Sequence, residues 1–286
     1  MARTNEQLAL LFPGQGSQTE DMHEAVERHR PDLAELARAE VSDDLFERAA
    51  EGTRWAQPAI FCAALAGYEV LRHRYEADLM AGHSLGEITA LVAAEAIDAP
   101  DGLRLVAARG RLMQEARGGG MIAVRVRERE PVEQVAAQTG LTIANDNAPD
   151  QLVLSGPLEA LDEAEELLRE RKVRAKRLPV GGAFHSPLME PAVAPFQELV
   201  ERIEVREPRV PVISCVTAAP FSDVRDQLVR ALTSPVRWTD VMGALRGLGA
   251  TRYVETGPGR VLTGLVRKSL DGVEAEAPLA MEAANA

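Results

Sequence analysis

LMAGHSLGEITALVAA, residues 79–94, sets a short apolar run, a G-x-S-x-G pattern and a helix-forming segment in direct succession. The apolar run predicts a buried strand over residues 79–81, and residues 86–94 are typical of a helix. Strand, G-x-S-x-G and helix in this order form the pattern of a nucleophile elbow. Because glycines on both sides permit a tight turn, we expect Ser84 to be held out at the start of a helix.

Further buried strands are expected on either side of this segment. Residues 9–12 form an apolar run that Pro13-Gly14 ends, and residues 210–216 and 253–255 give similar signals. The chain is helix-rich between the first two strands, up to about residue 75, and residues 103–116 have the periodicity of a long helix. The pattern predicts a large α/β domain, which we describe as α/β-hydrolase-like.

Residues 121–180 have a different organisation. Strand, helix, two strands, helix and a last strand over residues 173–180 follow one another there, which is the order of a ferredoxin-like unit. We therefore expect a small ferredoxin-like domain at 121–180. It would be inserted into a discontinuous large domain made of 1–120 and 181–286.

Bulk properties exclude several classes of protein. A net charge of −12 argues against general nucleic-acid binding. No apolar run approaches the roughly 20 residues that span a bilayer, and the first residues do not resemble a signal peptide. The two cysteines, Cys62 and Cys215, lack pairing or metal-ligand spacing, so we expect a cytoplasmic protein with no metal site. We also expect it to be a monomer.

The serine of the pattern is a candidate nucleophile, although a Ser that merely caps a helix would give the same local sequence. A nucleophilic Ser84 needs a base. The histidines are His23, His29, His73, His83 and His185. The first three lie in charged helical stretches and are expected at the surface. His83 could be catalytic, but its side chain should point away from that of Ser84, so we place it among the residues of the substrate site.

His185 is the favoured base, with a structural loop histidine as the alternative. It lies in a Gly- and Pro-marked loop directly after residue 180, and such loops often carry catalytic groups. No Asp or Glu near it indicates a triad, and an α/β-hydrolase would place its histidine later in the chain. We therefore expect a Ser–His dyad in which a backbone carbonyl orients the imidazole ring.

Arg109 interrupts the apolar face of the helix over residues 103–116. Its neighbours at helical spacing are Leu105, Val106, Leu112 and Met113. A buried guanidinium needs a partner to offset its desolvation. That partner could be an internal Asp or Glu, or a substrate carboxylate bound in bidentate fashion.

Five segments together resemble the malonyl-CoA:acyl carrier protein transacylase family, and polyketide synthase acyltransferase domains are similar. The segments are LFPGQGSQ (11–18), GHSLGE (82–87), RGRLMQ (109–114), AFHS (183–186) and ETGPG (255–259). They occur in the family's order over residues 8–268. The resemblance implies transfer of a malonyl group from malonyl-CoA, through an ester on Ser84, to the phosphopantetheine thiol of an acyl carrier protein.

The resemblance also implies roles for particular residues. Catalysis would fall to Ser84 and His185, and the oxyanion hole to the backbone N–H groups of Gln15 and Leu85. Arg109 would bind the free carboxylate. The site would be completed by Asn147, by Phe184 as the residue that disfavours a methylmalonyl group, and by the carbonyl of Ala231, which would orient the base. Cys215 stands where the family usually has Asn.

No bound cofactor is expected. The partners would be a CoA thioester and a carrier protein, with no nucleic acid and no membrane. A carrier could dock on the basic residues among 169–177, although a solvated basic edge would look the same. Alternatives are a transferase for another acyl unit and a hydrolase that uses the same dyad on an acyl thioester.

Overall fold

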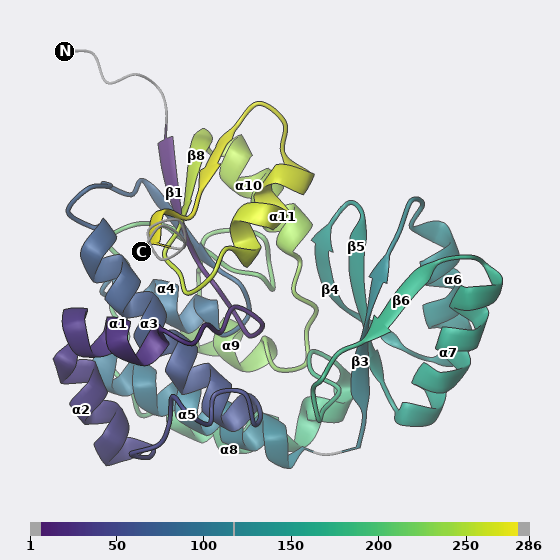
Figure 1. Cartoon of the computed structure of the whole chain (residues 1–286), viewed down its shortest axis with the longest axis horizontal. Helices are drawn as coiled ribbons and strands as arrows, with labels where there is room; N and C mark the ends of the chain where they lie inside the picture. Colours follow the sequence, from purple (N-terminus) through teal and green to yellow (C-terminus); the bar gives the residue numbers. More distant parts are fainter. Residues whose placement is uncertain (1–6, 117, 280–286) are drawn as a thin grey trace.

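The computed structural model describes residues 7–116 and 118–279 of the chain. Two lobes lie side by side, a large one and a small one that comprises residues 120–180 (Figure 1). The chain enters the small lobe after a long helix of the large lobe and returns to it before His185. This is an α/β architecture, as the sequence predicts, and it contains one parallel and one antiparallel sheet.

The large lobe is built on a sheet in which all neighbouring strands are parallel. Its strand order is β7 (Val212–Ile213), β2 (Leu79–Gly82), β1 (Gln7–Phe12), β8 (Ala250–Glu255) and β9 (Glu274–Glu276). Alternate residues of β1 pack into two different hydrophobic clusters, one on each face of the sheet. Leu8 and Leu10 pack on one side, and Ala9 and Leu11 on the other. Strands covered on both faces have near-continuous apolar sequences, which is why this strand could be predicted.

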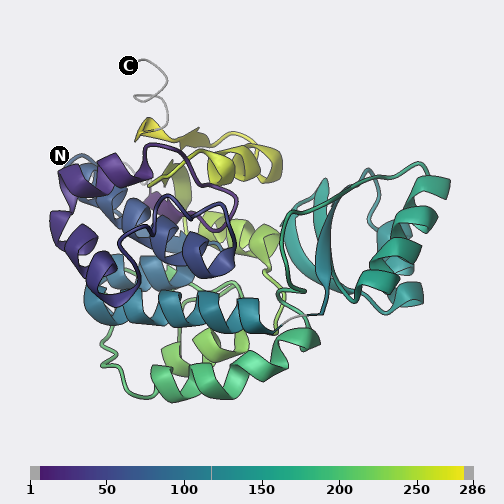
Figure 2. The ribbon, with the colours of Figure 1, turned by 60° about the horizontal axis from the view of Figure 1, so that its bottom comes forward.

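Helices cover both faces of the sheet (Figures 1 and 2). One face packs against α10 (Trp238–Gly247) and α11 (Val261–Ser269). The other helices of the large lobe are α1 (Met22–His29), α2 (Pro31–Glu40), α3 (Thr53–Leu71), α4 (Gly86–Ala93), α5 (Ala99–Glu115), α8 (Glu190–Val200) and α9 (Val224–Arg230), with the short 3-10 helix η1 (Pro187–Met189). Most of them pack around the larger apolar cluster, which contains Phe12, Phe61 and Phe196.

The small lobe follows the element order that the sequence predicts. It consists of β3 (Gly120–Arg125), α6 (Glu130–Thr139), β4 (Thr142–Ala148), β5 (Gln151–Gly156), α7 (Leu158–Glu170) and β6 (Arg174–Arg177). The strands form an antiparallel sheet in the order β4-β5-β3-β6. The two helices pack on one face of this sheet around their own apolar cluster (Figure 2).

Several predicted elements differ in length from those observed, and three of them have a local cause. The helix predicted from residue 103 begins at Ala99, because the Asp98 carboxylate caps it by accepting the Asp101 N–H at 2.8 Å. The strand predicted over residues 173–180 ends at Arg177, two residues before Pro179, which has no N–H to donate. The strand predicted over 210–216 is reduced to Val212–Ile213, because the chain turns back after it. Strand β9 was not predicted.

Within the part of the chain that the structure describes, no helix is both long and apolar enough to span a bilayer.

Candidate active site

The predicted elbow is present between β2 and α4. Ser84 has φ of 54°, a backbone conformation that non-glycine residues rarely adopt and that recurs where a fold over-determines a functional residue. The flanking glycines are needed for close packing. A Cβ on Gly82 would lie 1.9 Å from the backbone of Gly86, and one on Gly86 would lie 2.2 Å from the Phe12 carbonyl oxygen. The turn thus packs closely against both the start of α4 and the end of β1. The Ser84 side chain lies at the N-terminal end of α4.

Ser84 and His185 meet although 101 residues separate them. Ser84 Oγ lies 2.8 Å from His185 Nε2. The ring's other nitrogen, Nδ1, lies 2.9 Å from the Ala231 carbonyl oxygen and 3.1 Å from that of Ser234. Because carbonyl oxygens only accept, Nδ1 carries the proton and Nε2 accepts from the Ser84 hydroxyl. The imidazole is therefore held in the tautomer that a general base for Ser84 requires.

The environment keeps this imidazole neutral. Burial is the main reason that the pKa of His185 falls from 6.5 to about 3, and the positive charge of Arg109 adds to the effect. The two carbonyl oxygens at Nδ1 oppose the fall but do not reverse it. At neutral pH the ring is therefore free to accept a proton, and once protonated it would readily give that proton up.

Arg109 is buried, as predicted, with 3% of its surface exposed. Its guanidinium donates to Gln57 Oε1 at 2.8 Å and to Ser84 Oγ at 3.1 Å. Among residues 7–116 and 118–279, no carboxylate lies within ion-pair distance of it, although the charge of the buried Glu87 acts on it and favours its charged form. Burial lowers the pKa of Arg109 to about 10, so the side chain stays charged at neutral pH.

A cavity of about 430 Å³ lies between the lobes and contains these groups. The large lobe contributes Ser84, Arg109 and His185, and the small lobe contributes residues of β3, β4 and β5 and of the segment 178–180. Five more of the residues predicted for the site also line it, namely Gln15, His83, Leu85, Asn147 and Phe184.

Among the cavity-lining groups without an acceptor in the described residues are the backbone N–H groups of Gln15 and Leu85. They follow β1 and β2, which are adjacent in the sheet with Phe12 opposite Gly82. Ligands of parallel α/β sheets bind at the carboxyl ends of the strands, where both groups lie. Their arrangement allows a negatively charged oxygen to be bound beside Ser84.

His83 is separated from the dyad, as its place in the turn predicts. Its Nε2–H donates to Asn147 Oδ1 at 2.8 Å, and its ring packs against Trp238. Burial lowers the pKa of His83, so this histidine is also held neutral. The contact makes His83 a link between the elbow and strand β4 of the small lobe.

Cys215 forms hydrogen bonds with Glu87 and with Gly82 of the elbow. The Cys215 N–H donates to Glu87 Oε1 at 2.7 Å, and its thiol donates to the Gly82 carbonyl oxygen at 3.1 Å. Burial raises the pKa of Glu87 to about 7 despite that hydrogen bond and the charge of Arg109. Cys215 therefore supports the turn that carries Ser84.

Two contributors to the site were not predicted. Gln57, buried in α3, fixes the Arg109 guanidinium and is itself held by Thr53. An uncharged polar residue directly before the long apolar run of this helix, residues 58–67, was the available signal. Ser234 adds a second carbonyl at His185, and because that contact uses the main chain, its side chain gave no signal.

The described residues contain no group of three or more His, Cys, Asp or Glu side chains able to hold a metal ion.

Comparison with known proteins identifies the family. The family model described as an acyl transferase domain matches residues 10–281. The chain belongs to the acyl transferase domain family. Within this family, the malonyl CoA-acyl carrier protein transacylase of Bacillus subtilis is 37% identical over 284 residues, covering 91% of this chain and 90% of the relative. The polyketide biosynthesis protein ThaF of Burkholderia thailandensis is 40% identical over 92% of this chain, and the chain spans only 24% of its length.

Solved structures of acyl transferases have the same fold. The crystal structure of malonyl-CoA:acyl carrier protein transacylase from Xanthomonas oryzae pv. oryzae matches with a TM-score of 0.89 and 35% identity, covering 98% of this chain and 97% of that one. A malonyl-transacylase solved in complex with a type II PKS acyl-carrier protein matches with a TM-score of 0.87 and 32% identity, over 97% of this chain and all of that one.

Proposed function

We propose that this chain transfers a malonyl group from malonyl-CoA to the phosphopantetheine thiol of an acyl carrier protein, in fatty-acid or polyketide biosynthesis. The observation that carries the proposal is the convergence on Ser84 Oγ of a neutral base at 2.8 Å and a buried guanidinium at 3.1 Å. The similarity to malonyl transacylases supports the same activity. No resident cofactor is needed for this chemistry.

In the first half-reaction, Ser84 Oγ attacks the thioester carbonyl carbon while its proton passes to His185 Nε2. The N–H groups of Gln15 and Leu85 stabilise the oxyanion of the tetrahedral intermediate. The C–S bond then breaks, and the proton on His185 goes to the departing CoA sulfur. The malonyl group is left as an ester on Ser84.

In the second half-reaction the carrier's thiol replaces CoA. It loses its proton to His185 and attacks the ester carbonyl, and the Ser84 oxygen leaves and recovers that proton. Arg109 holds the free carboxylate in both halves, and Asn147, His83 and Phe184 shape the cavity around the acyl chain. Phe184 limits room for a branched acyl group.

The proposal extends to the fold and to the partner. We assign 1–120 and 181–286 to an α/β-hydrolase-like large domain and 121–180 to a ferredoxin-like one. That the chain acts as a monomer stays a prediction. The basic residues at the end of α7 and on β6 would dock the carrier, because β6 continues directly into residues 178–180 of the cavity wall. Arg171 and Arg174 there are exposed.

Transfer can be separated from hydrolysis by supplying radiolabelled malonyl-CoA with and without holo carrier protein. The proposal predicts that most of the label reaches the carrier thiol, whereas a thioester hydrolase would release free malonate at the same rate in both cases.

Reversing the charge at Arg171 and Arg174 should raise the KM for the carrier and leave that for malonyl-CoA unchanged. Arg202→Glu, at an exposed site in the large lobe, is the matched control.

A further inference from the structure

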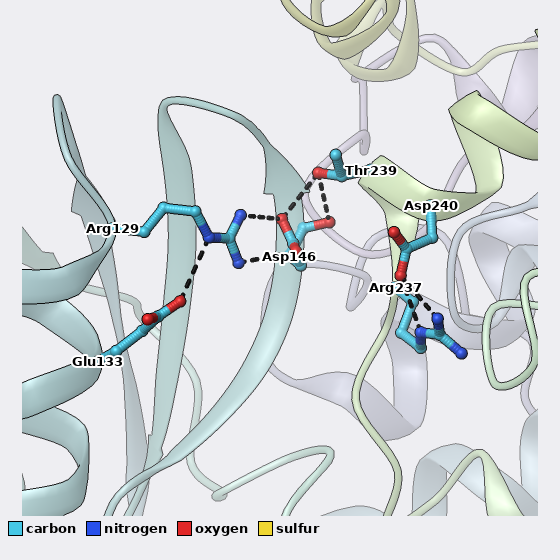
Figure 3. Close-up of polar contacts among 6 residues, drawn as sticks. All are labelled: Arg129, Glu133, Asp146, Arg237, Thr239 and Asp240. Carbon is cyan, nitrogen blue, oxygen red and sulfur yellow. Dashed lines mark hydrogen bonds and ion pairs between the residues drawn. The ribbon is translucent and has the colours of Figure 1, made fainter.

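Strand β4 of the small lobe has side chains directed to both the cavity and the large lobe. Its pairing with β5 shifts twice, between Ile143 and Asn145 and between Asp146 and Ala148. Such bulges re-aim side chains beside functional sites. Asn145 and Asn147, two residues apart, both line the cavity, while the carboxylate of Asp146 is directed between α6 and α10 (Figure 3).

Asp146 joins three segments through its side chain and its backbone. Arg129, at the start of α6, donates to both carboxylate oxygens, at 3.0 and 2.8 Å, and Thr239 Oγ1, in α10, donates to one of them at 2.7 Å (Figure 3). The Asp146 N–H donates to the Val236 carbonyl oxygen at 2.9 Å. The Val236 N–H in turn donates to the Ala144 carbonyl oxygen at 2.8 Å. Residues 236–239 are thus attached to β4 at two points, through the backbone of Val236 and through the side chain of Thr239.

The same segment orients the proposed base. Ser234, two residues before Val236, accepts from His185 Nδ1 through its carbonyl oxygen, as Ala231 does. Ala231 is fixed by the end of α9, whereas Ser234 lies in the connection from α9 to α10. The attachment to β4 is therefore the nearest anchor on the carboxyl side of the Ser234 carbonyl.

We propose that Asp146, braced by Arg129, is a positioning residue that holds His185 in register with Ser84 through Thr239 and the segment 234–236. This inference rests on the proposed function, in which His185 acts as the base. Without the Asp146 carboxylate the segment keeps its backbone bonds from Val236 to β4 but loses the side-chain bond at Thr239, so the Ser234 carbonyl is held less firmly against the ring. The imidazole then spends less time aligned with Ser84 Oγ, which slows the chemical step and leaves substrate binding as it was.

The test compares Asp146→Ala with Asp240→Ala. Asp240 is in α10, one residue from Thr239, and its ion pair with Arg237 does not reach β4 (Figure 3). The rate of acyl-enzyme formation from malonyl-CoA is measured by rapid quench over a range of substrate concentrations. We expect Asp146→Ala to lower the maximal rate by roughly tenfold or more, since misplacement by about 1 Å can cost a hundredfold. The KM should stay within about twofold, and Asp240→Ala should match the parent protein.

A second pair of variants covers the case in which Asp146→Ala does not fold. Thr239→Val removes the hydroxyl, and with it the contacts to the carboxylate and the backbone carbonyl of Asp146, at nearly constant volume, and Thr239→Ser restores the hydroxyl. The first should lower the maximal rate and the second should recover it. Equal rates for Asp146→Ala and Asp240→Ala, equal rates for Thr239→Val and Thr239→Ser, or an increase in KM alone would overturn the inference. A parent protein that forms no acyl-enzyme would instead overturn the proposed function.

Discussion

Arg109 offers a quantitative test of substrate choice, because its charge has no carboxylate ion-pair partner among the described residues and lies 3.1 Å from Ser84 Oγ. Arg109→Ala removes the group proposed to bind the malonyl carboxylate. Breaking a buried ion pair from one side costs about 3–5 kcal/mol, and each 1.4 kcal/mol is a factor of ten. Since the cavity is open to solvent, the lower end applies, and we expect about a hundredfold decrease in kcat/KM for malonyl-CoA.

The decisive quantity is the ratio of kcat/KM for malonyl-CoA to that for acetyl-CoA. Arg109 also contacts Ser84, so the substitution can slow both substrates, but only malonyl-CoA loses a carboxylate contact. Arg109→Lys keeps the positive charge but loses the paired N–H donors that bind a carboxylate in bidentate fashion, so it should give an intermediate ratio. Arg104→Ala, on the exposed face of the same helix, is the control and should change the ratio by less than about twofold. If the ratio for Arg109→Ala stays at the parent value, the guanidinium does not recognise the carboxylate.

Three further outcomes are expected. Because the pKa of His185 is lowered to about 3, the base is neutral above that pH, and the acylation rate should show no acidic limb near pH 6.5; a limb there, measured by rapid quench from pH 4 to 8, would contradict this. The pKa of Glu87 is about 7 in the folded chain against 4.5 unfolded, so the folded state holds the extra proton and the free energy of unfolding should fall by about 3 kcal/mol as the pH rises from 4.5 through 7. Urea unfolding at pH 5 and pH 8 should show a smaller fall for Glu87→Gln, and identical falls would refute the assignment. Phe184→Ala should enlarge the cavity and raise kcat/KM for methylmalonyl-CoA relative to malonyl-CoA by about tenfold, a change worth 1–3 kcal/mol per methylene, and an unaltered ratio would show that another residue sets the limit.

Local patterns were sufficient for the parts of the fold that local chemistry determines. Strand β1, strand β2 and the turn at Ser84 follow from apolar runs and from glycines that the backbone packing requires. Arg109 could be recognised as buried because helical periodicity places it among apolar neighbours. The shortness of β7 and the presence of the edge strand β9 could not be predicted, since long-range pairing rather than propensity defines them.

The site was predictable as far as its residues carry side-chain signals. Ser84, His185 and Arg109 were found, whereas the carbonyl of Ser234 was not, because main-chain contacts are independent of residue type. The link from Asp146 to Thr239 joins positions 93 residues apart and gives no sequence pattern. Contacts of this kind arise from how the lobes pack, and they appear only in three dimensions.

The most direct test of the account is the mass of the intact protein after it is mixed with malonyl-CoA, followed by peptide mapping. The account predicts one malonyl adduct on Ser84. No adduct should form on Ser84→Ala, and acylation of His185→Ala should be at least about a hundredfold slower. An adduct on another residue, or equally fast labelling of His185→Ala, would contradict the Ser84–His185 dyad.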